Sequence, residues 1–375
     1  MTKRSTQKVG DLEIRTVEAI PYAIPLIKPI KWARGEIKEV DNVLVVVTLG
    51  DGTQGIADAP SRPTILGDTQ ASIVAIVKGH FAPKLVGTDV FDTQRINNIL
   101  AGFAGNPAAK GAVDMASYDA QGKVLGVPCA NLLGGVVHPL PVNVRLRLAP
   151  EKDMLAEAQE MINKHGFKAI KVKGGTERDK DVRFLRRLRK EVGDHVEISI
   201  DFNQGYTAQG LLEVLPDLEE VNIALIEEPI PARDGAGKLL VSRATRIPIS
   251  GDDSCFTPDD VLHELKLGAI RSVVIKVARN GYTQGRDIVA LARAFYTPIH
   301  NGSQADMHIG TAAGAQFACS YRAEHAHEFS AFIDATDHLL DRDLEIRNGM
   351  LMTPEGPGIG VKIDPRKLAK YRLDR

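Results

Sequence analysis

The sequence contains few cysteines. The 375 residues include three, Cys129, Cys255 and Cys319, an odd number at wide spacing. Such a set does not form the disulfide framework of a small secreted protein, and it lacks the CxxC spacing of a structural zinc site. We therefore expect three reduced thiols in a cytoplasmic protein.

The sequence also lacks long apolar runs and an excess of charge of one sign. No apolar stretch approaches the ~20 residues that span a bilayer, and the amino terminus has no apolar core of the signal-peptide type. Lys and Arg total 47 against 48 Asp and Glu, which gives 47 − 48 = −1. This balance predicts no nucleic-acid partner and no membrane partner.

The length allows a barrel of about 250 residues and one further small domain. The first 130 residues are typical of an α+β domain, in which a short antiparallel sheet is followed by helices. Strands are expected at 17–26, 42–49 and 55–59, and helices at 69–78, 92–100 and 108–122. Two candidate loops lie between or after the strands: Lys28–Gly35, with the only tryptophan, Trp32, and Pro60–Gly67, with Arg62.

From residue 168 onward, apolar strand-like runs recur, and each ends in a charged residue. These residues are Lys173, Asp201, Glu227, Asp252 and Lys276, separated by 28, 26, 25 and 24 positions. A strand, a helix and two short loops need about that many residues. Because the carboxyl ends of the strands carry the active site in a (β/α) barrel, this series predicts five side chains around one site.

The rest of the barrel is expected on either side of this series. Strands are predicted at 142–148, 298–301 and 328–333, and helices at 151–164, 178–191, 208–218, 258–267, 285–294 and 307–319.

Three of the five charges are carboxylates, and carboxylates that converge need a compensating cation. An all-oxygen set favours Mg²⁺, with Mn²⁺ as the alternative, over zinc. Lys173 and Lys276 would lie on opposite sides of that ion, and Lys171 would supply a neighbouring charge that tunes Lys173 as a base. The arrangement permits racemisation, β-elimination or cycloisomerisation next to a carboxylate.

The ordered motifs resemble those of the enolase superfamily, in its muconate lactonizing enzyme subgroup. Lys171-Val-Lys173 resembles the KxK motif of the family, Asp201-Phe-Asn203 its DxN motif and Glu227-Glu-Pro229 its ExP motif. Asp252-Asp-Ser254 resembles the DES motif, and residues 275–281 resemble the segment with the lysine of the sixth strand. The sequence departs from the family pattern at Asp253, where glutamate is usual, and at Ala57-Asp58, Tyr206 and Gln304.

The resemblance implies an α/β protein, a modified TIM barrel of the (β/α)7β type with an N-terminal α+β capping domain. The implied boundaries are 1–130 for the cap, 131–345 for the barrel and 346–375 for a segment that packs back on the cap. Mg²⁺ would bind Asp201, Glu227 and Asp252, and Lys173 and Lys276 would be the acid/base pair. Loops around Trp32 and Arg62 would select the substrate, and a homo-oligomer, a dimer or an octamer, is implied. Further candidates to contact the substrate or support the site are Asn203, Asp253, Asp306 and Glu328.

These features favour a muconate cycloisomerase-like enzyme that interconverts cis,cis-muconate and muconolactone. A racemase or epimerase of N-acyl amino acids or dipeptides is the first alternative, and a dehydratase of the subgroup the second. A barrel used only for binding is a different class, which the intact set of lysines and carboxylates argues against. All enzymatic alternatives take a small-molecule carboxylate.

Overall fold

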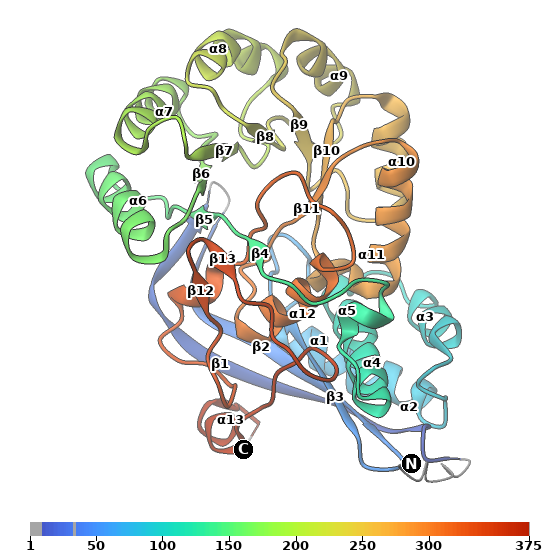
Figure 1. The fold of residues 1–375 in the computed structure, drawn as a ribbon. Helices are drawn as coiled ribbons and strands as arrows, with labels where there is room; N and C mark the ends of the chain where they lie inside the picture. Colours follow the sequence, from blue (N-terminus) through green and yellow to red (C-terminus); the bar gives the residue numbers. More distant parts are fainter. Residues whose placement is uncertain (1–9, 33–34, 375) are drawn as a thin grey trace.

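The structure is a computed structural model, and it describes residues 10–32 and 35–374, without the side chains of residues 31, 32 and 35. It is an α/β protein in which a curled parallel sheet with outer helices stands next to an antiparallel cap (Figure 1). In the described part of the chain, no helix has both the length and the apolar character that crossing a membrane requires.

The cap begins with a three-stranded antiparallel sheet in the order β1 (Ile14–Trp32), β2 (Gly35–Leu49) and β3 (Gln54–Pro60). The expected loop at 28–35 is therefore mostly the end of a long hairpin, because β1 pairs with β2 as far as Trp32 and Gly35. The helices α1 (Gln70–Ile76), α2 (Ala82–Leu85), α3 (Thr93–Ala101) and α4 (Pro107–Leu125) follow, with a π-helical turn (Val77–Phe81) between α1 and α2.

Helix α4 packs directly on β3, and a glycine permits this close approach. A Cβ atom on Gly55 would lie 1.9 Å from the carbonyl oxygen of Ala116 and 2.6 Å from the amide nitrogen of Ala120. The same helix contacts the barrel, because Asp114 accepts hydrogen bonds from the backbone amides of Tyr282 (2.6 Å) and Thr283 (2.9 Å). The cap is thus fixed to the barrel by a buried helix.

Seven parallel strands form the barrel in chain order. They are β5 (Val144–Arg145), β6 (Ala169–Lys173), β7 (Glu197–Asp201), β8 (Leu225–Glu227), β9 (Ile249–Gly251), β10 (Ser272–Ile275) and β11 (Ile299–Asn301). The helices between them are α6 (Glu151–His165), α7 (Arg178–Val192), α8 (Ala208–Glu220), α9 (Gly235–Ala244), α10 (Pro258–Leu267) and α11 (Val277–Ala294), and α12 (His308–Ala318) follows β11.

The barrel closes at its eighth position through a short segment. The amide of Asn143 donates to the carbonyl of His327 (2.9 Å), and the amide of Glu328 donates to the carbonyl of Asn301 (2.9 Å). The prediction of a strand over 328–333 was wrong in extent, because Ala331–Asp334 is a 3-10 helix. The prediction for 142–148 was too long, since only Val144–Arg145 is a barrel strand.

The short helices α2, α5 (Cys129–Leu132) and α13 (Pro365–Tyr371) were not expected, and two helices of the barrel also differ from the predictions. Helix α9 was not expected, and α11 begins at Val277 rather than Gly285. A backbone kink at Gly281, with φ +64°, separates the first turns of α11 from the rest.

The last residues return to the cap. Strands β12 (Ile346–Arg347) and β13 (Met350–Leu351) form a small sheet with β4 (Leu140–Pro141), which precedes the barrel together with α5 (Cys129–Leu132). Helix α13 (Pro365–Tyr371) contacts β1, and the amide of Leu373 donates to the carbonyl of Pro21 (2.9 Å). The three cysteines are buried free thiols, as expected.

Candidate active site

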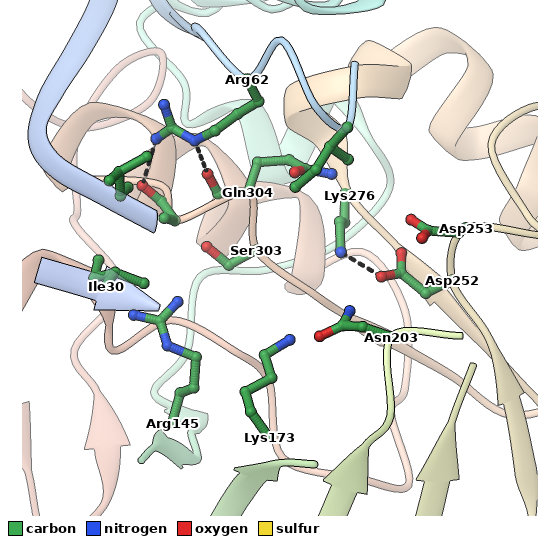
Figure 2. A pocket seen from close by; sticks show the side chains of 13 residues that line it. Ile30, Arg62, Arg145, Lys173, Asn203, Asp252, Asp253, Lys276, Ser303 and Gln304 are labelled. Carbon is green, nitrogen blue, oxygen red and sulfur yellow. Dashed lines mark hydrogen bonds and ion pairs between the residues drawn. The ribbon is translucent and has the colours of Figure 1, made fainter. Parts of the chain in front are cut away.

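A pocket lies at the carboxyl ends of the barrel strands, under the β1–β2 hairpin (Figure 2). The cap contributes three isoleucines and one arginine to the lining, and the barrel contributes mainly charged and polar residues. The lining consists of Ile30, Ile37, Arg62, Ile65, Arg145, Lys173, Asn203, Asp252, Asp253, Lys276, Ser303, Gln304 and Ala305. Three of the five predicted strand-end charges line this pocket directly.

The three acids at the strand ends converge, as the sequence predicted. Asp201 ends β7, Glu227 ends β8 and Asp252 follows β9, so consecutive parallel strands bring the carboxylates to one edge. One oxygen of each lies within 4.8 Å of the others, and all three residues are buried. We call these residues the acid triad.

The acid triad fits a divalent cation. Burial raises the pKa of Glu227 well above its usual range; Lys171 opposes this rise, and the neighbouring Asp201 and Asp252 add to it. This repulsion between buried carboxylates is what a cation would remove. Oxygen donors suit Mg²⁺ or Mn²⁺ better than softer metals, so the residues present agree with the predicted type of ion.

Lys173 and Lys276 lie on opposite sides of the acid triad. They come from the ends of β6 and β10, four strands apart in a barrel of eight positions. The ammonium of Lys173 donates to Asp201 (2.5 Å), and that of Lys276 donates to Asp252 (2.6 Å). Burial lowers the pKa of Lys276, but the charge of Asp252 outweighs this and raises it overall, so the group is an ammonium.

Lys171 lies below these groups and is completely buried. Its ammonium donates to both oxygens of Glu227 (2.8 and 2.7 Å) and lies 3.3 Å from Glu328. Burial lowers the pKa of Lys171, and Glu227 and Glu328 more than reverse this change. Lys171 therefore holds Glu227 in place by charge, and Glu328 lies within the same group of cations.

Asn203 and Asp253 are positioned by polar contacts on the same strand ends. Asn203 donates from Nδ2 to Asp201 (3.1 Å), while its Oδ1 is buried without a hydrogen-bond partner in the described chain. Asp253 accepts from Gln204 (2.6 Å), whose side-chain oxygen accepts from the amide of Ala232 (2.9 Å). Both residues line the pocket, as expected for groups near a substrate.

Arg62 reaches the pocket, but its donors are used within the protein. Nε donates to the carbonyl of Gln304 (2.8 Å), Nη2 to that of Ala305 (3.3 Å) and Nη1 to that of Ser61 (2.5 Å). These contacts join the cap to the loop after β11. A role of Arg62 in substrate selection stays a prediction, and the side chain of Trp32 lies outside the described part of the structure.

Asp306, a further candidate from the sequence, supports a loop next to the pocket. Its carboxylate accepts from the amide of Gln304 (3.1 Å), and the cap residue of α12 is Met307. Asp306 thus shapes the loop whose carbonyls Arg62 binds.

Sequence reasoning did not identify Arg145, Ser303 or Arg279 as site residues. Arg279 donates to the carboxylate of Asp252 (3.0 Å) from the first turn of α11. Arg145 ends β5, so the rule used for the other strand ends applies to it as well. It was missed because the expected strand ran past it to Leu148.

Comparisons with known proteins agree with this architecture. The family profile described as "Enolase C-terminal domain-like" matches residues 153–367, and "Mandelate racemase / muconate lactonizing enzyme, N-terminal domain" matches residues 14–134. A muconate lactonizing enzyme from Mycobacterium smegmatis, solved with muconolactone, superposes with a TM-score of 0.94. It is 36% identical, and the match covers 96% of this chain and all of that one.

Curated relatives include two kinds of isomerase. Muconate cycloisomerase 1 of Rhodococcus opacus is 29% identical over 94% of this chain and 97% of its own length. The L-Ala-D/L-Glu epimerase of Bacillus subtilis is 29% identical over 93% of this chain and 97% of its own length. Equal identity to both leaves the choice of reaction to the site.

Proposed function

Because the chain belongs to the enolase superfamily, in its muconate lactonizing enzyme subgroup, we propose that it is a muconate cycloisomerase-like enzyme that interconverts cis,cis-muconate and muconolactone. The observation that carries this proposal is the placement of Lys173 and Lys276 across one pocket, each next to an acid of the triad. The high structural similarity to the muconate lactonizing enzyme of M. smegmatis supports it.

Asp201, Glu227 and Asp252 would hold the divalent ion, which we propose is Mg²⁺. When bound, it offsets the negative charge that develops on a substrate carboxylate. In the lactonizing direction an oxygen of the second substrate carboxylate adds to one carbon of the C=C bond, the electron pair of that bond moves to the carbon next to the first carboxylate, and one lysine ammonium delivers a proton to that carbon. In the reverse direction the neutral lysine removes the proton and the C–O bond of the lactone breaks. We assign this proton transfer to Lys276, whose ammonium form the ion pair with Asp252 favours.

The cap excludes water from the reaction. Ile30, Ile37 and Ile65 lie over the pocket mouth, opposite the charged strand ends. An apolar cover strengthens the electrostatic contacts beneath it and protects the reacting carbon from unwanted proton exchange. The pocket thus has charged residues at the strand ends and apolar residues of the cap on the opposite side.

An epimerase is the second candidate, because two lysines on opposite sides can remove a proton from one face of a carbon and return it to the other. We further propose a homo-oligomer, the domain boundaries 1–130, 131–345 and 346–375, and a cytoplasmic location.

The test is ¹H NMR in D₂O with Mg²⁺, with cis,cis-muconate in one sample and N-succinyl amino acids or dipeptides in others. We expect lactone with one deuterium incorporated. Loss of α-proton signals in the other samples, with muconate unchanged, would replace the cycloisomerase by the epimerase.

A further inference from the structure

Arg145 occupies one side wall of the pocket. It ends β5 and is in register with Lys171 of β6, so its side chain enters the barrel at the level of Lys171. The side chain is only 10% exposed. Figure 2 shows its guanidinium on the side of Lys173, away from Asp252 and Asp253.

The guanidinium of Arg145 has unused hydrogen-bonding capacity. Nη2 donates to Asp334 at 3.3 Å, and Nε is buried without a partner among the residues that the structure describes. Arg62, the other arginine of the pocket lining, differs in this respect, because it donates to three backbone carbonyls. A buried, unpaired donor on a charged group is costly, so this edge of Arg145 is suited to a ligand.

The charge of Arg145 is also only partly balanced. Its partner Asp334 is shared with Arg147, whose Nη1 lies 3.2 Å from the other carboxylate oxygen. Arg147 has a second acid, Glu157, at 2.5 Å, but Arg145 has no second acid within ion-pair distance in the described chain. A planar guanidinium with a free edge is the group that best binds a carboxylate through two parallel hydrogen bonds.

We propose that Arg145 is a specificity residue that binds a second carboxylate of the substrate, at the end remote from the acid triad. The substrate class is then a dicarboxylate, and a molecule whose remote end is neutral or an ammonium group is disfavoured. This inference rests on the proposed function in one respect, namely that the first carboxylate of the substrate faces the acid triad.

The substrates under consideration differ in this feature. cis,cis-Muconate and N-succinyl amino acids carry two carboxylates, whereas a dipeptide with neutral side chains brings an ammonium group to its remote end. The guanidinium would repel that ammonium. Arg145 therefore selects against such dipeptides whichever reaction the lysines catalyse.

The experiment compares the binding of adipate and hexanoate in the presence of Mg²⁺ by isothermal titration calorimetry. Both probes have six carbons, and only adipate has a second carboxylate. We expect the wild-type protein to bind adipate about 10- to 100-fold more tightly. Arg145→Gln should reduce this affinity ratio to about 1–3. Arg145→Lys keeps the positive charge but not the planar pair of donors, so it should give an intermediate ratio.

Arg147→Gln is the matched control, because Arg147 pairs with the same Asp334 but does not line the pocket. It should leave the preference for adipate unchanged. An unchanged ratio in Arg145→Gln, or an equal loss in Arg147→Gln, would overturn the inference. If Arg145→Gln does not fold, the adipate-to-hexanoate affinity ratio of Arg145→Lys is the test, and a wild-type ratio in that variant would overturn the inference.

Failure of the proposed function is distinguishable from failure of this inference. If wild-type protein does not convert muconate but loses its adipate preference in Arg145→Gln, the cycloisomerase fails and the subsite stands. If it converts muconate and the preference does not depend on Arg145, the subsite fails and the cycloisomerase stands.

Discussion

Arg62 joins the cap to the barrel, and replacing it tests how much that connection contributes to stability. Its guanidinium is 2% exposed and donates across the interface to the carbonyls of Gln304 (2.8 Å) and Ala305 (3.3 Å). Arg62→Met would keep much of the side-chain volume and leave both carbonyls without this donor. We expect the variant to fold with a loosened loop after β11.

The magnitude follows from the three hydrogen bonds to carbonyls that the variant loses, those to Gln304, Ala305 and Ser61. Each hydrogen bond from a charged donor contributes about 1.5–3 kcal/mol. The arginine is costly to bury, and burial accordingly lowers its pKa, which nearby acids oppose. Relief of that cost offsets part of the loss. We therefore expect a net destabilisation of about 3 kcal/mol.

This destabilisation can be measured by calorimetry as a decrease in the unfolding temperature, Tm. An unfolding entropy of about 2.1 cal/mol/K per residue gives roughly 0.8 kcal/mol/K for 375 residues. A loss of about 3 kcal/mol then lowers Tm by about 4 °C. Arg15→Met on the exposed side of β1 is the control, with an expected change below about 1 °C. Equal Tm values for the two variants would refute the assignment of Arg62 as a stabilising connection.

Three further predictions concern the acids and lysines. Lys276→Ala should lower turnover by about 10²–10⁴-fold while Mg²⁺ binding, measured by calorimetry, stays intact; wild-type rates would remove Lys276 from the mechanism. Asp252→Asn should weaken Mg²⁺ binding by about tenfold or more, and unchanged affinity would count against the acid triad as the metal site. Asp58 is a buried carboxyl whose pKa burial raises to about 7, against hydrogen bonds from Asn42 and Tyr22. A raised pKa means that its contribution to stability is complete below about pH 4 and is lost as pH rises to about 7. Asp58→Asn should therefore gain up to about 4 kcal/mol relative to wild type across that window, and a pH-independent difference in unfolding free energy would contradict this.

The positions of the proposed catalytic groups could be predicted because their signal is local. Each of the five charges directly follows a short apolar run, and the spacing of 24–28 residues fixes one strand and one helix per charge. In parallel strands the ends share one edge, so the sequence alone placed the acid triad and its two lysines together. The structure confirms this convergence.

Helix α9 shows why other elements could not be predicted. Its segment begins with Gly235-Ala-Gly237, which disfavours a helix, and carries Lys238 where an apolar residue would be expected. Lys238 is buried because it forms an ion pair with Glu264 of α10. That partner is 26 residues away, and no local pattern indicates it.

Partners that are distant in the sequence also explain the difference between Arg62 and Arg145. Both occur in the sequence next to short apolar segments, and both line the pocket. Arg62 is committed to carbonyls more than 240 residues further along the chain, whereas Arg145 keeps a buried donor without a partner. Whether an arginine is structural or available to a ligand depends on these distant partners, which only the folded chain supplies.

The difference between local signals and long-range contacts explains why the type of reaction is easier to predict from the sequence than the substrate. The groups that we propose move protons and hold the cation lie on strand ends of the barrel, where local pattern sets their direction. The groups that we propose contact the rest of the substrate include Ile30, Ile37 and Ile65 of the cap, together with Arg145, all of which line the pocket. The position of the cap over the pocket depends on contacts such as those of Asp114 with α11 and of Arg62 with Gln304. These contacts connect parts of the chain that are distant in the sequence. Changes in the hairpin or at Arg145 can therefore alter the substrate while the acid triad and the lysines keep their geometry, which agrees with relatives of equal identity that catalyse different isomerisations.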